Sequence, residues 1–379
     1  MKPTWLFIDL ATDFGGHEVM LLQWIEELRR QGEVEPILVC AKASRLAQLG
    51  PLQLSTYEVD TLRGSLAAKL LRFAKLMQQL YALKRAHRPV ITVIAEGCLM
   101  AQRHAVLATR AVGLRSIVYV PLVSSFTDMG FPNAERLEQR MRSSYRKLPS
   151  AWITITPHQA EELRSWSGAE QPVFCLPNTV AAQFEESNGH HAANAIDTPA
   201  RQSKILVLGR LDPHQKGLDL LLQHLTNRPA LARDVRVSFV GEGPFLPAIQ
   251  AALSAHPWLA ELMVVEGWQD ASTALAKHDV LLIASRFEGV PLVMLEAMAS
   301  GVPVVSTDLP GTRPYLPASC LFQFGDFDRA FEIARSLRDD PDLRETVVKK
   351  NLKSFADKAS PTAFGAAVRE LTVQLGALA

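Results

Sequence analysis

A strand–helix–strand pattern between residues 280 and 305 constrains the fold of this chain most. Residues 280–284 are all apolar, and a run of that length is typical of a strand buried on both faces of a parallel sheet. Good helix formers follow at 292–299, and then Gly301 precedes a second apolar run at 303–305. Because parallel strands need a crossover that is usually a helix, the segment predicts an α/β sheet covered by helices.

Two carboxylates lie in this segment, Glu288 in the loop and Glu296 on the helix. Gly289 lets a ligand approach the main chain, and Pro291 fits the first helical position. The amino end of a helix attracts phosphate, and Glu296, roughly 8 Å further along the axis, can accept hydrogen bonds from neighbouring hydroxyls of a ribose. The alternative is that both are ordinary surface carboxylates. The apolar neighbours of Glu296 argue against that alternative.

Two cations flank a second strand-to-helix loop. The apolar strand expected at 204–208 ends in Gly209 and Arg210, and Lys216 precedes the next helix. Arginine can grip an oxyanion with two parallel hydrogen bonds, and lysine adds a mobile point charge. Together they match the charge of a diphosphate, although each alone is more simply a solvated loop cation.

Two further strands end in glycine-containing turns. The strand at 236–240 is followed by Gly241 and Gly243, which lack a third glycine at dinucleotide-fingerprint spacing. The strand at 262–265 is followed by Gly267, in a turn that either lines a base pocket or is purely structural.

The order and spacing of these motifs over residues 204–312 resemble the donor-binding domain of the family-four retaining glycosyltransferases, which have the GT-B fold. The resemblance implies that Arg210 and Lys216 hold the nucleotide diphosphate, that Glu296 holds the ribose, and that Glu288 faces the donor sugar. The residues so assigned to catalysis are Arg210, Lys216 and Glu288, and those assigned to donor binding are Gly15, Gly16, Gly209, Gly267, Gly289, Val290, Pro291, Leu292 and Glu296.

The resemblance also implies an architecture and a reaction. We expect two Rossmann-like, doubly wound parallel-sheet domains facing across a cleft: 1–182 for the acceptor, 183–203 as linker, 204–360 for the nucleotide sugar, and 361–379 as a helix that can return to the first domain. The expected enzyme moves a hexosyl group from a nucleoside-diphosphate sugar to a glycan or lipid-linked acceptor, in bacterial surface polysaccharide or glycolipid synthesis. It retains the anomeric configuration and uses no metal or other cofactor. A sugar-nucleotide epimerase and a noncatalytic nucleotide-sugar-binding protein are the alternatives.

The amino-terminal half matches less closely. A strand at 5–10, the pair Gly15 and Gly16, and an amphipathic helix at 19–31 fit the family's Gly-Gly loop near the diphosphate, or else a simple glycine turn. Many relatives carry a histidine after the strand corresponding to 116–120, but residues 120–128 contain none. Its task then passes to a main-chain carbonyl or to one of three polar residues, Ser124, Ser125 and Asp128.

Charge is unevenly spread although the net charge is only +1. Between residues 63 and 147 there are fifteen Lys and Arg residues and four Asp and Glu residues. Leucines interleave with the first cations, so a basic amphipathic helix here can lie on an anionic membrane surface or pack on the sheet as an ordinary surface helix. No aromatic–basic platform indicates a nucleic-acid partner.

The remaining features favour a cytoplasmic protein, peripheral on the inner face of the membrane if the basic region binds lipid. The four cysteines are scattered at neither metal-ligand nor disulfide-framework spacing. No signal peptide is visible, and no apolar run reaches the roughly 20 residues that span a bilayer.

Overall fold

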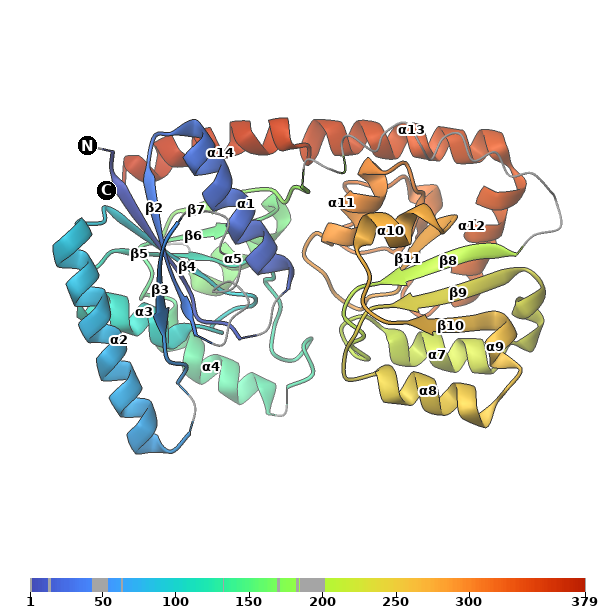
Figure 1. Ribbon diagram of the computed structural model, residues 1–379, viewed down its shortest axis with the longest axis horizontal. Coiled ribbons are helices and arrows are strands. Elements are labelled where there is room, and N and C mark those ends of the chain that lie inside the picture. The colour runs from blue at the N-terminus through green and yellow to red at the C-terminus, as the bar shows by residue number, and fades with distance from the viewer. Residues whose placement is uncertain are drawn as a thin grey trace. The chain divides into compact units, whose positions relative to one another are not determined.

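The computed structural model describes residues 2–12, 15–42, 54–62, 64–131, 133–168, 171–181, 184 and 202–378, apart from the side chains of 137, 140 and 141 (Figure 1). It contains two compact units: unit 1 comprises Met1–Asn178 and Phe364–Ala379, and unit 2 comprises Thr179–Ala363. Most of the expected linker, and Arg63 of the basic region, lie outside the described residues.

Unit 1 contains a seven-stranded parallel sheet with the order β3-β2-β1-β4-β5-β6-β7. The chain adds β2 and β3 on one side of β1 and then returns to add β4 to β7 on the other, so the strand order reverses between β1 and β4. The strands are β1 Thr4–Asp9, β2 Glu35–Ala41, β3 Ser55–Val59, β4 Ile91–Ala95, β5 Ser116–Tyr119, β6 Ala151–Thr154 and β7 Val173–Cys175.

Helices pack on both faces of this sheet. Leu6 and Ile8 of β1 share a buried cluster with residues of α2 and α3, whereas the alternate residues Trp5 and Phe7 contact Trp24 of α1, with ring centroids 6.4 and 5.3 Å apart. Such alternation is typical of a strand buried on both faces. The helices of unit 1 are α1 Gly16–Gln31, α2 Leu66–His87, α3 Arg103–Ala111, α4 Ala134–Tyr145, α5 Pro157–Ser167 and α14 Pro361–Gly376.

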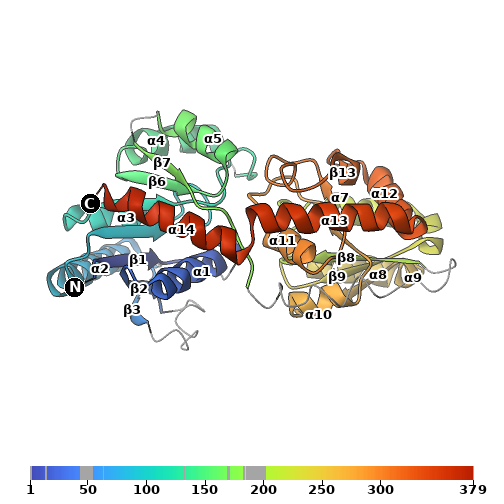
Figure 2. The ribbon, with the colours of Figure 1, turned by 90° about the horizontal axis from the view of Figure 1, so that it is seen from above.

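Helix α14 returns the end of the chain to unit 1 (Figure 2). Its apolar residues Phe364, Val368, Leu371 and Leu375 are buried. Gln31 at the end of α1 donates a hydrogen bond from Nε2 to the Gly365 carbonyl oxygen at 2.8 Å.

Unit 2 contains a six-stranded parallel sheet with the order β10-β9-β8-β11-β12-β13, which reverses between β8 and β11. The strands are β8 Ser203–Leu208, β9 Val235–Val240, β10 Met263–Glu266, β11 Val280–Ile283, β12 Val304–Thr307 and β13 Leu321–Phe322. The helices are α7 Leu218–Thr226, α8 Leu246–Ala255, α9 Leu259–Leu262, α10 Ala271–Ala276, α11 Leu292–Ala299, α12 Phe327–Asp339 and α13 Pro341–Lys358, with 3-10 turns η3 Pro229–Arg233 and η4 Ala318–Cys320.

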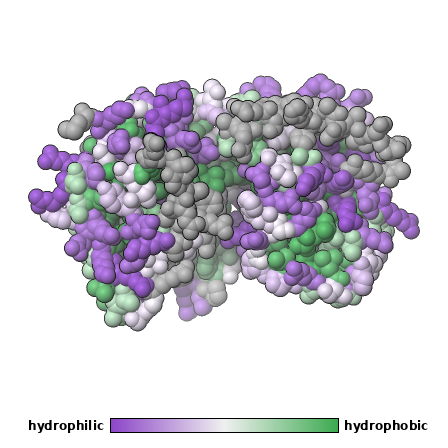
Figure 3. All heavy atoms as spheres, viewed as in Figure 1, coloured by the Kyte–Doolittle hydropathy of each residue, from purple (hydrophilic) through white to green (hydrophobic). Residues whose placement is uncertain are grey.

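The predicted pair of parallel α/β sheets is confirmed. The expectation for Pro291 was wrong by one position: Pro291 is the N-cap of α11, in extended conformation at φ −63° and ψ 125°, and Leu292 is the first helical residue. On the face drawn in Figure 3 hydrophilic residues cover much of the surface. Within the part of the chain that the structure describes, no helix combines the length and the apolar character needed to cross a bilayer.

Candidate functional site

The loops that follow β8 and β11 meet at the carboxyl edge of the sheet in unit 2. These two strands are neighbours, with Leu206 paired to Leu281, and the strand order reverses between them. In open α/β sheets, ligands bind in the crevice at such a switch point. A small concavity lies here, and its lining includes Gly209, Arg210, Lys216, Ser285, Pro291 and Val293.

Lys216 and Glu288 are in direct contact although 72 positions separate them in the chain. The Lys216 Nζ donates to Glu288 Oε1 at 2.5 Å, and the Ser285 hydroxyl donates to the same oxygen at 2.7 Å. The Glu288 side chain is 8% exposed, so its charge is balanced mainly by Lys216. The structure thus brings two of the three predicted catalytic residues together.

Arg210, the third of these residues, lies on the same loop with a largely exposed side chain. Its guanidinium donates to Gln215 Oε1 at 2.8 Å and lies 3.9 Å from Asp212 Oδ2. Exposed contacts of this kind are weak, so the guanidinium can turn toward an anion bound in the concavity.

Arg286 fastens the two loops together, a role that the sequence did not reveal. It binds Asp219 at the start of α7 with two parallel hydrogen bonds of 2.8 and 2.7 Å. It also donates to the carbonyl oxygens of Pro213 and His214 at 3.0 and 2.7 Å. Although partial burial opposes it, hydrogen bonding from Arg286 lowers the pKa of Asp219 below its ordinary value. Arg286 therefore fixes the loop that carries Arg210 and Lys216.

Two glycines permit close approach of the backbone to the loop after β11, Gly217 from the loop after β8 and Gly311 from the loop after β12. Gly217 has φ +65°, and a Cβ atom there would overlap the Ala284 carbonyl oxygen at the end of β11. A Cβ atom on Gly311 would overlap the carbonyl oxygen of Gly289. A side chain at either position would push the contacting backbone segments apart.

The loop from Gly289 through Val290 and Pro291 leads into α11, where Leu292 and Glu296 lie on the first turns. Burial, and secondarily the nearby Asp270 carboxylate, raise the pKa of Glu296 to about 7. Glu296 is thus a carboxyl group poised to ionise near neutral pH.

Gly267 follows β10, two strands away from β8. The structure does not place it in the concavity, although Asp270, three residues further on, caps α10 and influences Glu296. Its assignment to donor binding therefore stays a prediction.

Residues 202–337, within unit 2, match the sequence family described as Glycosyl transferases group 1. This stretch of unit 2 is therefore similar to the glycosyl transferases group 1 family. Sulfoquinovosyl transferase SQD2 of Arabidopsis thaliana is 29% identical over 151 residues, which are 38% of this chain and 28% of that protein. Alpha-D-kanosaminyltransferase of Streptomyces kanamyceticus is 23% identical over 245 residues, covering 59% of this chain and 60% of the relative. The chain therefore spans less than two thirds of these curated relatives.

Solved structures resemble the whole chain in fold. Sucrose-phosphate synthase from Thermosynechococcus elongatus has a TM-score of 0.77 at 15% identity, with 100% of both chains covered. Alr3699/HepE of Anabaena, solved in complex with UDP, has a TM-score of 0.74 at 16% identity, with 99% of this chain and 100% of that chain covered. These similarities confirm the GT-B fold that the sequence predicted.

In unit 1, the predicted donor-binding residues Gly15 and Gly16 lie at the start of α1. Gly15 is the N-cap of the helix, and its N–H donates to Glu18 Oε2 at 2.8 Å. Both glycines follow β1, at the point where the strand order of unit 1 reverses. Among the polar residues that could replace the family histidine, Ser125 Oγ donates to Asp128 Oδ2 at 2.6 Å.

Buried ionisable groups lie at the same edge of unit 1. Burial would lower the pKa of His17, but the adjacent Asp9 and Glu18 carboxylates raise it to about 9. Glu96, after β4, accepts hydrogen bonds from Tyr145 Oη and from the backbone N–H groups of residues 100 and 102, yet its complete burial raises its pKa to about 7. Asp9, His17 and Glu18 are the described residues whose ligand atoms lie close enough to hold a metal ion.

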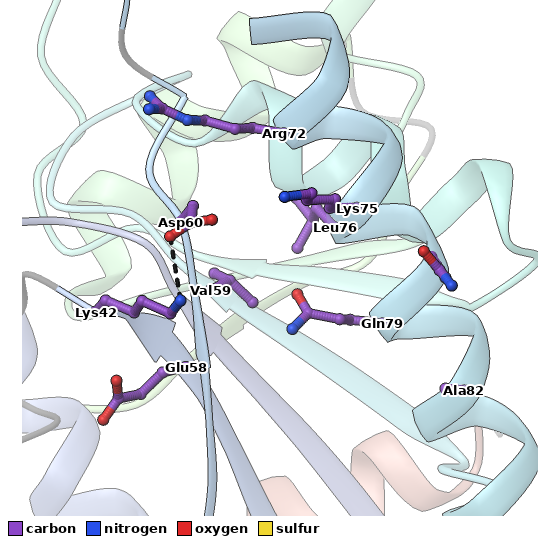
Figure 4. Close-up of a pocket in the computed structure, with 10 residues that line it drawn as sticks. Lys42, Glu58, Val59, Asp60, Arg72, Lys75, Leu76, Gln79 and Ala82 are labelled. Atoms are coloured by element: carbon purple, nitrogen blue, oxygen red, sulfur yellow. Dashed lines mark ion pairs between the residues drawn. The ribbon is translucent and has the colours of Figure 1, made fainter. Parts of the chain in front are cut away.

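A polar cavity of about 390 Å³ opens between β3 and α2 (Figure 4). Arg72 and Lys75 reach it from α2, and on the strand side Lys42 pairs with Asp60 at 3.3 Å. No sequence pattern predicts this cavity, because β3 is a polar strand with four exposed residues.

Proposed function

We propose that the protein transfers a sugar from a nucleoside-diphosphate sugar to a glycan or lipid-linked acceptor in surface polysaccharide or glycolipid synthesis. One observation carries the proposal: Arg210, Lys216 and the amino end of α11 converge at the switch point of unit 2. Structures of similar fold solved with UDP and UDP-glucose support a uridine nucleotide as the first donor to test.

The cations and the helix end would stabilise the leaving diphosphate. As the glycosidic bond breaks, negative charge develops on the phosphate oxygens, and fixed cations and dipoles lower the free energy of that state. The Lys216 ammonium has three N–H donors, so it can keep Glu288 and also bind a phosphate oxygen. Arg210 can turn from Gln215 to the diphosphate, and the first N–H groups of α11 lack intrahelical acceptors.

Glu296 would bind the ribose. An ionised carboxylate accepts hydrogen bonds from two neighbouring hydroxyls. Because the pKa of Glu296 is raised to about 7, its ionised fraction grows between pH 6 and pH 8. We therefore expect donor affinity to rise over that interval.

We also infer retention of anomeric configuration and no metal requirement at the diphosphate. The resemblance to family-four enzymes supports retention, with the departing phosphate taking the acceptor proton. Arg210 and Lys216 supply positive charge that a metal would otherwise provide. The ¹H NMR spectrum of the product reports the configuration, and an unchanged donor dissociation constant on adding Mg²⁺ is the expected result for the second point.

Contact with an anionic membrane would present a lipid-linked acceptor. Leu66, Leu70 and Leu71 at the start of α2 are 75%, 61% and 60% exposed, whereas Leu76, Leu80 and Leu83 further along pack inside. Apolar residues reach the surface among hydrophilic ones near this end of α2 (Figure 3). An apolar face with adjacent cations is the pattern of a helix that lies in a bilayer interface.

Flotation with anionic and neutral liposomes tests this contact. The double variant Leu70→Ser and Leu71→Ser should lose binding to anionic vesicles, whereas Val373→Ser, which changes a residue 72% exposed on α14, should keep it. Equal recovery of the wild-type protein in the soluble fraction with both vesicles would end the membrane proposal.

Calorimetry with UDP, GDP and ADP and their sugars tests the donor site. Glu296→Ala should weaken binding of the preferred nucleotide at least about tenfold, corresponding to about 1.4 kcal/mol. Glu345→Ala, at a largely exposed position of α13, should not. If Glu296→Ala binds the nucleotide as the wild type does, the proposed site is wrong. Epimerisation of the donor without acceptor would indicate an epimerase, and binding without transfer would indicate a noncatalytic nucleotide-sugar-binding protein.

A further inference from the structure

Three ionisable side chains converge at the switch point of the sheet in unit 1. Asp9 is the last residue of β1, and His17 and Glu18 lie in the first turn of α1. One ligand atom from each lies within 4.8 Å of the others. Gly97, just after the neighbouring strand β4, leaves room for the imidazole, since a Cβ atom there would lie 3.1 Å from the His17 ring.

Each carboxylate is fixed through one oxygen and left bare at the other. Asp9 Oδ1 accepts from Gln102 Nε2 at 2.8 Å and from the Ala11 N–H at 2.9 Å. Glu18 Oε2 accepts from the Gly15 N–H at 2.8 Å. Both side chains are fully buried, yet Asp9 Oδ2 and Glu18 Oε1 have no hydrogen-bond partner among the described residues. A buried oxygen without a hydrogen-bond partner lowers the stability of the fold, so these two oxygens are candidate ligand atoms for a bound ion.

The imidazole is oriented in the same way. His17 Nδ1 lies 2.9 Å from Glu18 Oε2, and Nε2 lies 3.4 Å from Asp9 Oδ2. The Nε2–Oδ2 separation exceeds the roughly 2.7–2.9 Å of a charge-assisted hydrogen bond, and His17 Nε2 has no hydrogen-bond partner among the described residues. Two ligand atoms that each lie about 2.1 Å from one ion are about 3.0–3.4 Å apart when the ligand–ion–ligand angle is between 90° and the tetrahedral value. The 3.4 Å between His17 Nε2 and Asp9 Oδ2 therefore fits a shared ion.

We propose that Asp9, His17 and Glu18 bind a divalent transition-metal ion, Mn²⁺ or Zn²⁺. Nitrogen and carboxylate oxygen together suit such ions better than Mg²⁺ or Ca²⁺, which prefer oxygen alone. The second contacts made by Gln102 and by the Gly15 N–H hold the carboxylates in place, as partners of metal ligands commonly do. The ion would fasten the end of β1 to the start of α1. Because Asp9, His17 and Glu18 belong to unit 1, whereas Arg210, Lys216 and α11, which carry the proposed function, belong to unit 2, the inference does not depend on the proposed function.

Electron paramagnetic resonance of the full-length chain tests the site without nucleotide present. After metal removal with a chelator, Mn²⁺ is titrated in and its free six-line signal is followed. We expect one equivalent to bind, and at least tenfold weaker binding in Asp9→Asn and in His17→Gln. Glu26→Gln, which changes an exposed carboxylate of α1, should bind as the wild-type protein does. Competition by Zn²⁺ should displace the bound Mn²⁺.

A second measurement protects the test against misfolded variants. In the wild-type protein, electron spin-echo modulation should show coupling between bound Mn²⁺ and an imidazole nitrogen. Absence of saturable binding of Mn²⁺ and Zn²⁺, absence of nitrogen coupling, or equal binding by folded Asp9→Asn and His17→Gln would each overturn the proposal. The cluster would then be a protonated histidine between two acids.

Discussion

Replacing Arg286 with lysine should loosen the loop that carries Arg210 and Lys216. Arg286 makes four hydrogen bonds, two to Asp219 and two to carbonyl oxygens. A lysine cannot reproduce the planar fork and would keep about half of them. Two lost hydrogen bonds to charged or carbonyl groups, discounted because Asp219 is 40% exposed, amount to about 2 kcal/mol.

Calorimetric unfolding and nucleotide titration measure the two consequences of Arg286→Lys. A loss of about 2 kcal/mol in a unit of this size should lower its melting temperature by roughly 4–8 °C, and UDP should bind at least about fivefold more weakly. Arg329→Lys is the matched control, because that arginine pairs with Glu332 in solvent on α12, where an ion pair is worth under about 1 kcal/mol. Wild-type melting and wild-type affinity in Arg286→Lys would refute the reasoning.

Three further outcomes follow from the site. Lys216→Ala should reduce kcat by at least about 100-fold in a transfer assay. The control Lys353→Ala, at an exposed position of α13, should not reduce it. Similar kcat values for both variants would show that Lys216 has no part in the mechanism. Burial raises the pKa of Glu296 from 4.5 to about 7, so ionisation of this group lowers the free energy of unfolding as the pH rises through 7. In urea denaturation, Glu296→Gln should be more stable than the wild type at pH 8, by at most about 3 kcal/mol. At pH 4 the two proteins should be equally stable. Gly311→Ala should lower the free energy of unfolding by more than about 2 kcal/mol, because its Cβ atom would overlap a carbonyl oxygen. Gly267→Ala is the control, since a Cβ atom there meets open space. Equal melting temperatures for the two variants would show that the backbone around Gly311 relaxes freely.

The parts of the fold that the sequence predicted are those with strong local signals. Strand β11 is a continuous apolar run and β8 contains one from Ile205 to Leu208, and glycine or proline marks the ends of their loops. Strand β3 was missed because four of its five residues are exposed, so no apolar pattern distinguishes it from a loop. Strands β7 and β13 have only three and two residues, which is too short for a periodic signal.

The candidate site divides along the same line. Lys216 and Glu288 could be placed near each other because their loops follow neighbouring strands of a recognisable domain. The role of Arg286 could not be predicted, since its partners lie 67 to 73 positions away and any exposed aspartate could have received it. The contact of His17 with Asp9 could not be predicted either, because Asp9 ends β1 and the sequence does not specify the path of the loop between them.

The return of α14 to unit 1 has a consequence for synthesis on the ribosome. Unit 2 is one continuous segment, so all of it exists once residue 363 has been made, whereas unit 1 is incomplete until the final helix emerges. Domains that are synthesised first usually fold first. Here unit 1 stays incomplete, because the surface that will bury Phe364, Val368 and Leu371 is exposed until α14 has been made. Ribosome-bound chains that end at residue 363 and continue into a linker long enough to fill the exit tunnel should therefore be protease-resistant in unit 2 and sensitive in unit 1. Equal resistance would show that unit 1 closes without its last helix.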